Sequence, residues 1–186
     1  AVVGIPKTID NDIMLLDKSF GFETAFGVAV QALKCAHIEA LGSMNGIGLV
    51  KLMGRDSGFI ACYASLAGSN VDFVLIPEVP FELHGEGGLL ERLRYCLARK
   101  RNAVIVLAEG AGQHLLMADD ATDASGNRRL VDIGSFLKER INAFFQERKI
   151  ECTLKYIDPS HMIRSVPANA ADNFYCSQLA HNAVHA

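Results

Sequence analysis

The stretch AVIVLAEGAG, residues 103–112, decides the fold class of this 186-residue chain. It starts with apolar residues that include three β-branched side chains, turns polar at Glu109 and then runs into glycines. A short apolar run that ends in glycines predicts a strand that is buried on both faces. Strands of this kind are typical of parallel sheets that helices cover on both sides.

Similar apolar runs alternate with helical patterns along the rest of the chain. Further strands are expected at residues 1–5, 47–53, 72–78 and 151–158. Helices are expected at residues 20–41, 58–68, 87–101, 132–148 and 168–186, with an exposed loop at 112–130. Asp132 is the expected N-cap of its helix. This order predicts an α/β fold, an open and mainly parallel sheet with helices on both faces.

Composition excludes several classes of protein. The net charge of −3 does not indicate a general nucleic-acid binder, and no apolar run approaches the roughly 18 residues that a membrane span needs. The five cysteines are widely spaced and form no C-x-x-C pair. Free thiols of this kind favour a cytoplasmic protein over a disulfide framework or a zinc site.

The two ends of the sequence resemble the interior of a longer chain. The chain opens on AVVGI without a Met and closes on QLAHNAVHA, which has the pattern of a helix in mid-course. We therefore expect an internal fragment of a longer polypeptide.

Charged and polar residues follow the expected strands. In parallel sheets, ligands bind just beyond the carboxyl ends of the strands. The residues at these ends are Lys7, Thr8, Asp10 and Asp12; Met53, Gly54, Arg55 and Asp56; Glu78; Glu109; and Asp158, His161 and Arg164, with Lys155 close to the end of the last strand.

This mixture of cations and carboxylates suits a phosphorylated polyol as ligand. In phosphoryl transfer to an alcohol, a carboxylate accepts the hydroxyl proton, while cations and Mg²⁺ offset charge on the transferring group. Asp10 suits the role of base because it lies in a tight polar turn after an apolar run. Thr8 and Lys7 are placed to contact a phosphoryl group, and Asp12 to contact Mg²⁺ directly or through water.

Each of these residues also has a purely structural interpretation. Asp10 and Asp12 are residue types that make Asx-turns or cap helices, and Arg55 has Asp56 beside it as an ion-pair partner. Their coincidence at one edge of the sheet favours a functional site. The chain lacks both G-x-G-x-x-G and G-x-x-x-x-G-K-[ST], which argues against a nicotinamide-dependent oxidoreductase and a Walker-type site.

Several segments together strongly resemble the 6-phosphofructokinase family. They are GIPKTIDNDI (4–13), SFGFETA (19–25), GIGLVKLMGRDSGFIA (46–61), LIPE (75–78), VIVLAEGAGQ (104–113) and KYIDPSHMIRS (155–165). The resemblance covers the whole chain in order and is closest to the plant-like and bacterial branch, in which Pro-Lys precedes TIDND. The combination of TIDND, MGR and AEG is highly specific.

The resemblance implies a phosphofructokinase-like fold and a glycolytic kinase that is a homo-oligomer. It would transfer a phosphoryl group to the 1-hydroxyl of fructose 6-phosphate with Mg²⁺. By resemblance, Asp10 is the catalytic base, and Thr8 contacts the hydroxyl and the phosphoryl group. Met53, Gly54 and Arg55 line the sugar-phosphate site, with Arg55 near the transferring phosphoryl.

The remaining residues carried over by resemblance bind the substrate. Glu109 binds sugar hydroxyls, and His161 and Arg164 bind the sugar and its 6-phosphate. Lys155, with Tyr156 beside it, reaches the 6-phosphate across a subunit interface. The sequence departs from the family pattern at His161, where this branch usually has Tyr, and at Gly46, where simple bacterial enzymes have an Arg. That inter-subunit phosphate contact is expected to be absent or replaced.

The phosphoryl donor is the open question. The resemblance implies that residues 1–186 span the acceptor site, with the donor-binding portion upstream and a further C-terminal portion outside the chain. The resemblance implies that a lysine at position 7 occurs in both ATP-dependent and pyrophosphate-dependent relatives. The residues of the motifs NGIGLVKLMGR and AEGAGQ favour ATP. The alternatives are a pyrophosphate-dependent enzyme or a non-catalytic sugar-phosphate-binding regulatory subunit. The isolated fragment is expected to be inactive.

Overall fold

Four parallel strands form the sheet in the computed structural model, which describes residues 2–116 and 130–186. Their order is β2-β3-β1-β4, with bounds β1 Gly46–Leu52, β2 Phe73–Leu75, β3 Asn102–Ala108 and β4 Thr153–Ile157. The apolar run 103–108 is β3, which pairs with β1 on one side and β2 on the other. The predicted parallel α/β architecture is confirmed.

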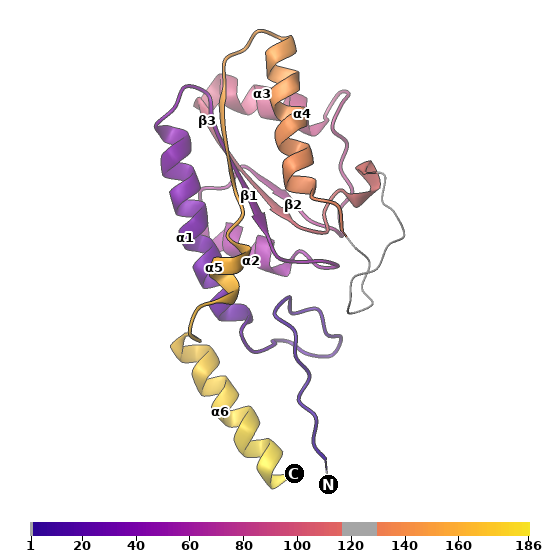
Figure 1. Ribbon diagram of the computed structural model, residues 1–186, viewed down its shortest axis with the longest axis vertical. Coiled ribbons are helices and arrows are strands. Elements are labelled where there is room, and N and C mark those ends of the chain that lie inside the picture. The colour runs from indigo at the N-terminus through magenta and orange to yellow at the C-terminus, as the bar shows by residue number, and fades with distance from the viewer. Residues whose placement is uncertain (1, 117–129) are drawn as a thin grey trace.

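Helices cover both faces of this sheet, as Figure 1 shows. One face carries α1 (Phe22–Leu41), α2 (Phe59–Gly68) and the short α5 (Ser160–Arg164). The other carries α3 (Leu89–Lys100) and α4 (Ile133–Glu147), and Asp132 is the N-cap of α4 as predicted. A 3₁₀ turn, Gln113–Leu115, follows β3, and α6 (Ala170–His185) ends the chain. Among the described residues, no helix combines the length and hydropathy needed to cross a membrane.

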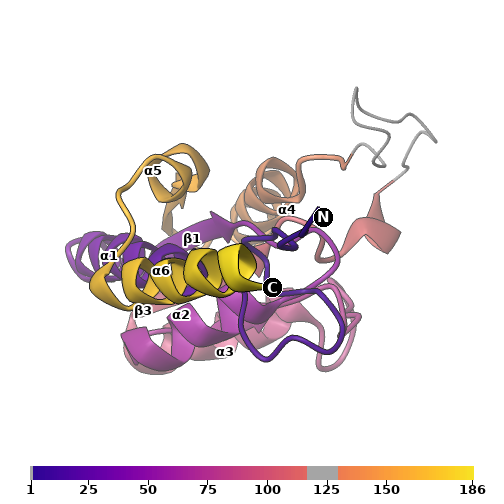
Figure 2. The ribbon, with the colours of Figure 1, turned by 90° about the horizontal axis from the view of Figure 1, so that it is seen from below.

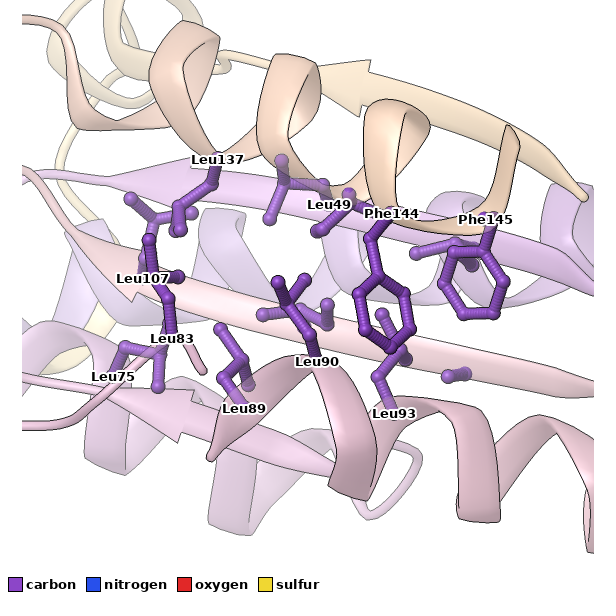
Figure 3. Close-up of a cluster of buried hydrophobic side chains, with 14 of the residues drawn as sticks. Leu49, Leu75, Leu83, Leu89, Leu90, Leu93, Leu107, Leu137, Phe144 and Phe145 are labelled. Carbon is purple, nitrogen blue, oxygen red and sulfur yellow. The ribbon is translucent and has the colours of Figure 1, made fainter. Parts of the chain in front are cut away.

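Alternating side chains of the central strands build two separate cores. On β3, Val104, Val106 and Ala108 pack with α1 and α2, whereas Ile105 and Leu107 pack with α3 and α4. Figure 3 shows the second core, in which leucines of the sheet and of α3 face Phe144 and Phe145 of α4. Burial of each such side chain contributes about 1.5–3 kcal/mol. The central strands are therefore apolar on both faces.

The helix α1 lies unusually close to β1. A Cβ atom on Gly46 would lie 2.1 Å from the carbonyl oxygen of Ala40. Ala36 and Ala40 are fully or almost fully buried on the facing side of α1. The backbone of α1 therefore occupies the space that a side chain at position 46 would need, so this close packing excludes the Arg of simple bacterial enzymes here.

The expected strand at the start of the chain is wrong. Residues 2–5 lie outside the sheet, and the Val2 side chain is 100% exposed. A strand needs a neighbour for its backbone groups, and this segment pairs with none of the four described strands. Figures 1 and 2 show the first residues and α6 extending from the same end of the molecule, away from the sheet.

Smaller differences have local causes. The strand expected at 72–78 is shortened to Phe73–Leu75 because β2 is an edge strand and Pro77 has no N–H to donate. The helix α5 was not predicted, because its five residues are too few to show a period. Of the loop expected at 112–130, residues 117–129 lie outside the described residues.

A buried carboxylate joins α6 to the first turn of α1. Asp172 is 0% exposed, and its Oδ1 accepts a hydrogen bond from the Gly21 amide at 3.0 Å. Its Oδ2 accepts from the amide and the hydroxyl of Thr24 at 2.7 and 2.6 Å. The N-cap residue Gly21 offers no side chain to cap α1. Asp172 therefore supplies that cap from the far end of the sequence.

We predict that the Asp172→Asn substitution lowers the free energy of unfolding of the protein by about 1–3 kcal/mol at neutral pH, because it weakens charge-assisted hydrogen bonds. Burial raises the pKa of Asp172, but hydrogen bonds from Thr24 and Gly21 outweigh it and hold the pKa below the usual 3.8. The stabilisation is thus complete above pH 3.8 and is lost as the pH falls through the lowered value. Denaturant titrations at pH 2.5–7 measure it, and an unchanged acid dependence in the Asn variant contradicts the assignment.

Candidate functional site

The segment TIDND, residues 8–12, is a turn closed by its own side chains. The Thr8 hydroxyl donates to Asp12 Oδ1 at 2.6 Å and accepts from the Asp10 amide at 3.2 Å. Asn11 has a φ of 60°. Its side chain donates to the Asp17 carbonyl at 3.3 Å and accepts from the Ser19 amide at 2.7 Å. The turn interpretation therefore fits Asp12, whereas the Asp10 carboxylate takes no part in these turn bonds.

Asp10 is held against the loop that follows β1. Its backbone carbonyl accepts a hydrogen bond from the Ser57 hydroxyl at 3.2 Å, and its carboxylate receives a backbone hydrogen bond from Arg55. Its Oδ1 atom is buried and has no hydrogen-bond partner among residues 2–116 and 130–186. A buried oxygen without a partner carries a desolvation penalty unless a ligand satisfies it. A donor such as a hydroxyl group would satisfy this oxygen.

The surroundings of Asp10 favour its protonated form. Burial raises its pKa above the usual 3.8, and the nearby charges of Asp12 and Glu109 raise it further. The backbone hydrogen bond from Arg55 and the charge of Arg164 act in the opposite direction and are outweighed. A carboxylate with a raised pKa is a better proton acceptor than an ordinary one. The same interactions place Asp12, Glu109 and Arg164 around Asp10.

The loops after β1 and β3 are locked together beside Asp10. The Glu109 amide donates to the Leu52 carbonyl at 2.9 Å, and the Gly110 amide donates to the Gly54 carbonyl at 3.0 Å. A Cβ atom on Gly110 would lie 1.7 Å from the Arg55 carbonyl oxygen. Only glycine allows this approach. The MGR and AEG motifs therefore form one unit, and the position of Arg55 depends on the glycine of the other motif.

Two pockets are lined by residues of the predicted site. Arg164 of α5 contacts the buried Met53 side chain, with Arg164 Nε 3.0 Å from Met53 Sδ. Arg164 lines a pocket of about 510 Å³ together with Lys7, Thr8, Ile9, Phe20 and Gly21. A second pocket, of about 290 Å³, is lined by Arg55, Asp56, Pro77, Glu78, Gly110, Gln113 and Leu130. Asp10 interacts with one residue of each pocket, with the backbone of Arg55 and with the charge of Arg164.

Most of the predicted site residues converge here, but Lys155, Tyr156 and His161 do not. Lys155 forms an ion pair with Glu39 of α1 at 3.3 Å, and the Tyr156 hydroxyl donates to Asp132 at 3.3 Å. Neighbours on β4 point to opposite faces of the sheet, so Lys155 is directed to the α1 face and Tyr156 to the α4 face. His161 is exposed on α5, three residues before Arg164.

Several residues around the site were not predicted. Ser57 fixes the Asp10 backbone, and Lys51 pairs with carboxylates beyond the end of β1. Lys51 could have been found, because a lysine in an otherwise apolar strand signals a buried partner. Ser57 gave no signal of its own. Glu78, which the sequence placed at the same edge, accepts a hydrogen bond from the Gly58 amide at 2.8 Å before α2.

A metal ion would find oxygen ligands but no closed cage. Among the described residues, no group of three or more His, Cys, Asp or Glu side chains converges closely enough to hold an ion. Asp12 is exposed, and its Oδ1 is already bonded to Thr8. Mg²⁺ is commonly bound through one or two carboxylates together with substrate phosphates and water. The donor set near Asp12 fits that mode.

Comparison with known proteins gives one consistent family. The family described as Phosphofructokinase matches residues 1–186. ATP-dependent 6-phosphofructokinase 7 of Arabidopsis thaliana is 57% identical over 188 residues, and ATP-dependent 6-phosphofructokinase of Amycolatopsis methanolica is 52% identical over 193. Both cover 100% of this chain, which spans 39% and 42% of their lengths.

Solved structures agree on the fold. Phosphofructokinase from Saccharomyces cerevisiae covers 96% of this chain with a TM-score of 0.69 and 22% identity, and the match spans 21% of that chain. A pyrophosphate-dependent phosphofructokinase from Nitrosospira multiformis covers 97% with a TM-score of 0.65 and 17% identity, over 43% of its own chain. At these identities the likeness concerns the fold.

The contact between the two loops makes a direct prediction. Gly110→Ala should lower the free energy of unfolding by about 2–3 kcal/mol, because the added methyl group must displace the Arg55 backbone. Gly42→Ala is the matched control, since its Cβ would meet Glu39 and Ile38 carbonyls at the ordinary distances of 3.6 and 3.7 Å. Thermal melts of both variants check this, and equal melting temperatures would show that the loops are not locked.

Proposed function

The chain belongs to the phosphofructokinase family, and we propose that the whole protein phosphorylates fructose 6-phosphate at its 1-hydroxyl with ATP. The observation that carries the proposal is the buried Oδ1 of Asp10, which lies near Arg55, Glu109 and Arg164 and has no hydrogen-bond partner in the described part of the chain. This chain would supply the acceptor side of the site. Since it spans about two fifths of the relatives named above, the donor-binding and C-terminal portions would come from the rest of a longer polypeptide.

Asp10 is the base in this proposal. Its carboxylate accepts the proton of the 1-hydroxyl as the sugar oxygen forms its bond to the γ-phosphorus and the bond to ADP breaks. The Arg55 side chain then offsets the charge that develops on the transferring group. The hydrogen bonds from Ser57 and Arg55 keep Asp10 in place, so little reorganisation is needed during the reaction. Thr8, bonded to Asp12, holds the turn and lies beside the reacting hydroxyl.

The sugar phosphate would occupy the pocket that Arg164 lines. Arg164 and the exposed His161 come from the same helix and bind the 6-phosphate and the sugar in this proposal. Glu109, beside Asp10, accepts hydrogen bonds from sugar hydroxyls. Met53 and Gly54 form the adjoining wall. The ring and phosphate are thereby oriented with the 1-hydroxyl toward Asp10.

Lys155 would act on a neighbouring subunit. Within the chain Lys155 is paired with Glu39, half-way along the sheet and on the α1 face. An exposed lysine there reaches a phosphate only in another copy of the protein. We therefore include a homo-oligomer in the proposal.

Magnesium and the donor phosphates would lie on the side of Lys7 and Asp12. Mg²⁺ supplies charge neutralisation of the phosphoryl oxygens when bound. Asp12 would hold it directly or through water, and the exposed ammonium of Lys7 would face the donor phosphates.

ATP is favoured over pyrophosphate by the names of the relatives. The relatives at 52–57% identity are called ATP-dependent, whereas the pyrophosphate-dependent structures from Marinobacter aquaeolei and Nitrosospira multiformis are 24% and 17% identical. The cytoplasm is the proposed location, supported by five free cysteines. A similar Arabidopsis protein, 54% identical, is named chloroplastic, so microscopy of a tagged protein distinguishes cytoplasm from plastid.

The donor assignment predicts that the full-length protein forms fructose 1,6-bisphosphate with ATP and Mg²⁺ at a kcat/KM at least 100-fold higher than with pyrophosphate. A coupled assay with each donor measures this. A preference for pyrophosphate would show that the donor assignment is wrong and would leave the assignment of the acceptor site unchanged. Activity with neither donor, combined with binding of fructose 6-phosphate, would identify a regulatory subunit instead.

The base assignment predicts that Asp10→Ser lowers kcat by about 10²–10⁴-fold, because proton transfer loses its acceptor. Binding of fructose 6-phosphate, measured by calorimetry, should remain within about threefold of the wild type, since the phosphate contacts are untouched. Asp17→Asn is the control, as Asp17 is exposed in the same loop and contributes only its backbone carbonyl to the turn. Retained turnover in the Asp10 variant would refute its role.

A further inference from the structure

Lys51 is the one charged residue of β1, whose other residues are all buried. Its side chain is 15% exposed and ends between two carboxylates that come from different parts of the chain. The ammonium lies 2.9 Å from Asp158 Oδ2 and 3.2 Å from Asp132 Oδ1. A lysine largely removed from water is tolerated only when it is paired. A lysine is therefore stable at this position of the sheet because it pairs with Asp132 and Asp158.

Asp158 controls the start of α5. It follows β4 directly, and its Oδ1 accepts from the amide and the hydroxyl of Ser160 at 3.1 and 2.5 Å. The carboxylate thus makes the turn with one oxygen and binds Lys51 with the other. The five residues of α5 bury only Ile163 in the core. Apolar packing alone gives this short helix a single anchoring point.

The end of β1 holds α5 at two further points. Lys51 binds Asp158 before the helix, and Met53, two residues along the chain, contacts Arg164 at the last residue of the helix. Lys51 belongs to the central strand β1, and Met53 is the first residue after it. Without the first contact, the beginning of α5 is held by its link to β4 and by the buried Pro159, and the direction of Arg164 loses a constraint.

Both members of the Lys51–Asp158 ion pair are charged, because the interactions around them outweigh the effect of burial on their pKa values. Burial lowers the pKa of Lys51, but the hydrogen bond to Asp158 and the neighbouring Tyr156 and Asp132 outweigh it and raise the pKa above its usual value. Burial raises the pKa of Asp158, while hydrogen bonds from Ser160 and Lys51 outweigh it and lower the pKa. Both groups are ionised at neutral pH.

We propose that Lys51 is a positioning residue for the sugar-phosphate site, which fixes the β4–α5 turn through Asp158 and thereby aims Arg164 at the 6-phosphate of the substrate. Lys51 does not touch the substrate itself. The inference rests on the proposed function, because it assigns Lys51 an effect on the same acceptor site. The second partner of Lys51, Asp132, has a different role, because it caps α4. It accepts hydrogen bonds from the Gly134 amide at 3.1 Å and from the Ser135 hydroxyl at 2.6 Å.

The test uses the full-length protein and compares Lys51→Met with Lys51→Arg. Methionine keeps the length and removes the charge, and arginine restores the charge. We expect Lys51→Met to raise the KM for fructose 6-phosphate about 10-fold, with kcat and the KM for ATP within about twofold, because only ground-state positioning of the phosphate is affected. Lys51→Arg should recover most of that loss.

Two further variants separate positioning from stability. Asp158→Asn keeps an oxygen for the Ser160 turn but loses the ion pair, so it should raise the same KM even if Lys51→Met fails to fold. Arg148→Met is the control, because it breaks an ion pair of the α4 C-cap with Glu91, at 3.3 Å, far along the helix from the site. It should leave every kinetic constant unchanged.

The outcomes distinguish this inference from the proposed function. An active wild type whose Lys51→Met and Asp158→Asn variants melt at lower temperature with an unchanged KM for fructose 6-phosphate would overturn the positioning role alone. An equal loss of kcat and of affinity for both substrates would do the same. A wild type that does not phosphorylate fructose 6-phosphate would overturn both.

Discussion

The parallel pairing of β1 with β3 is the constraint on which the rest of the structure depends. It brings the carboxyl ends of two strands side by side, so that the MGR and AEG loops leave the sheet together. Their contact is close enough that Gly110 admits no side chain against the Arg55 carbonyl. Arg55 in turn gives Asp10 its backbone hydrogen bond. A shift of one strand relative to the other would therefore displace the base as well as the sheet.

The polar turn at residues 8–12 shows that structural and functional interpretations need not compete. Thr8 and Asp12 bond to each other within the turn, and the Asn11 side chain bonds to the backbone of Asp17 and Ser19. That leaves Asp10 as the member of the segment whose carboxylate has a buried oxygen without a partner in the described part of the chain. The turn thus prepares the group that the chemistry would use, and its raised pKa follows from the burial that the turn imposes.

Sequence reasoning failed where a residue depends on a partner that local pattern does not reveal. Residues 2–5 are as apolar as a strand but have no described strand beside them. Lys155 belongs to the predicted motif, yet the alternation of β4 turns it toward Glu39. Lys51 is recognisable in the sequence as a charged residue within an apolar strand, but its two carboxylate partners, Asp132 and Asp158, lie far away in the sequence.

The sequence by itself determined the class of fold and the edge where the site lies. Continuous apolar runs can be buried only in a sheet covered on both faces, and polar residues at every strand end mark one edge. Only the tertiary structure decided which of those residues meet, because the distance between segments depends on strand order and side-chain direction. Asp10, Arg55 and Arg164 come together from three distant segments, whereas Lys155 and Tyr156, adjacent to the same motif, face elsewhere.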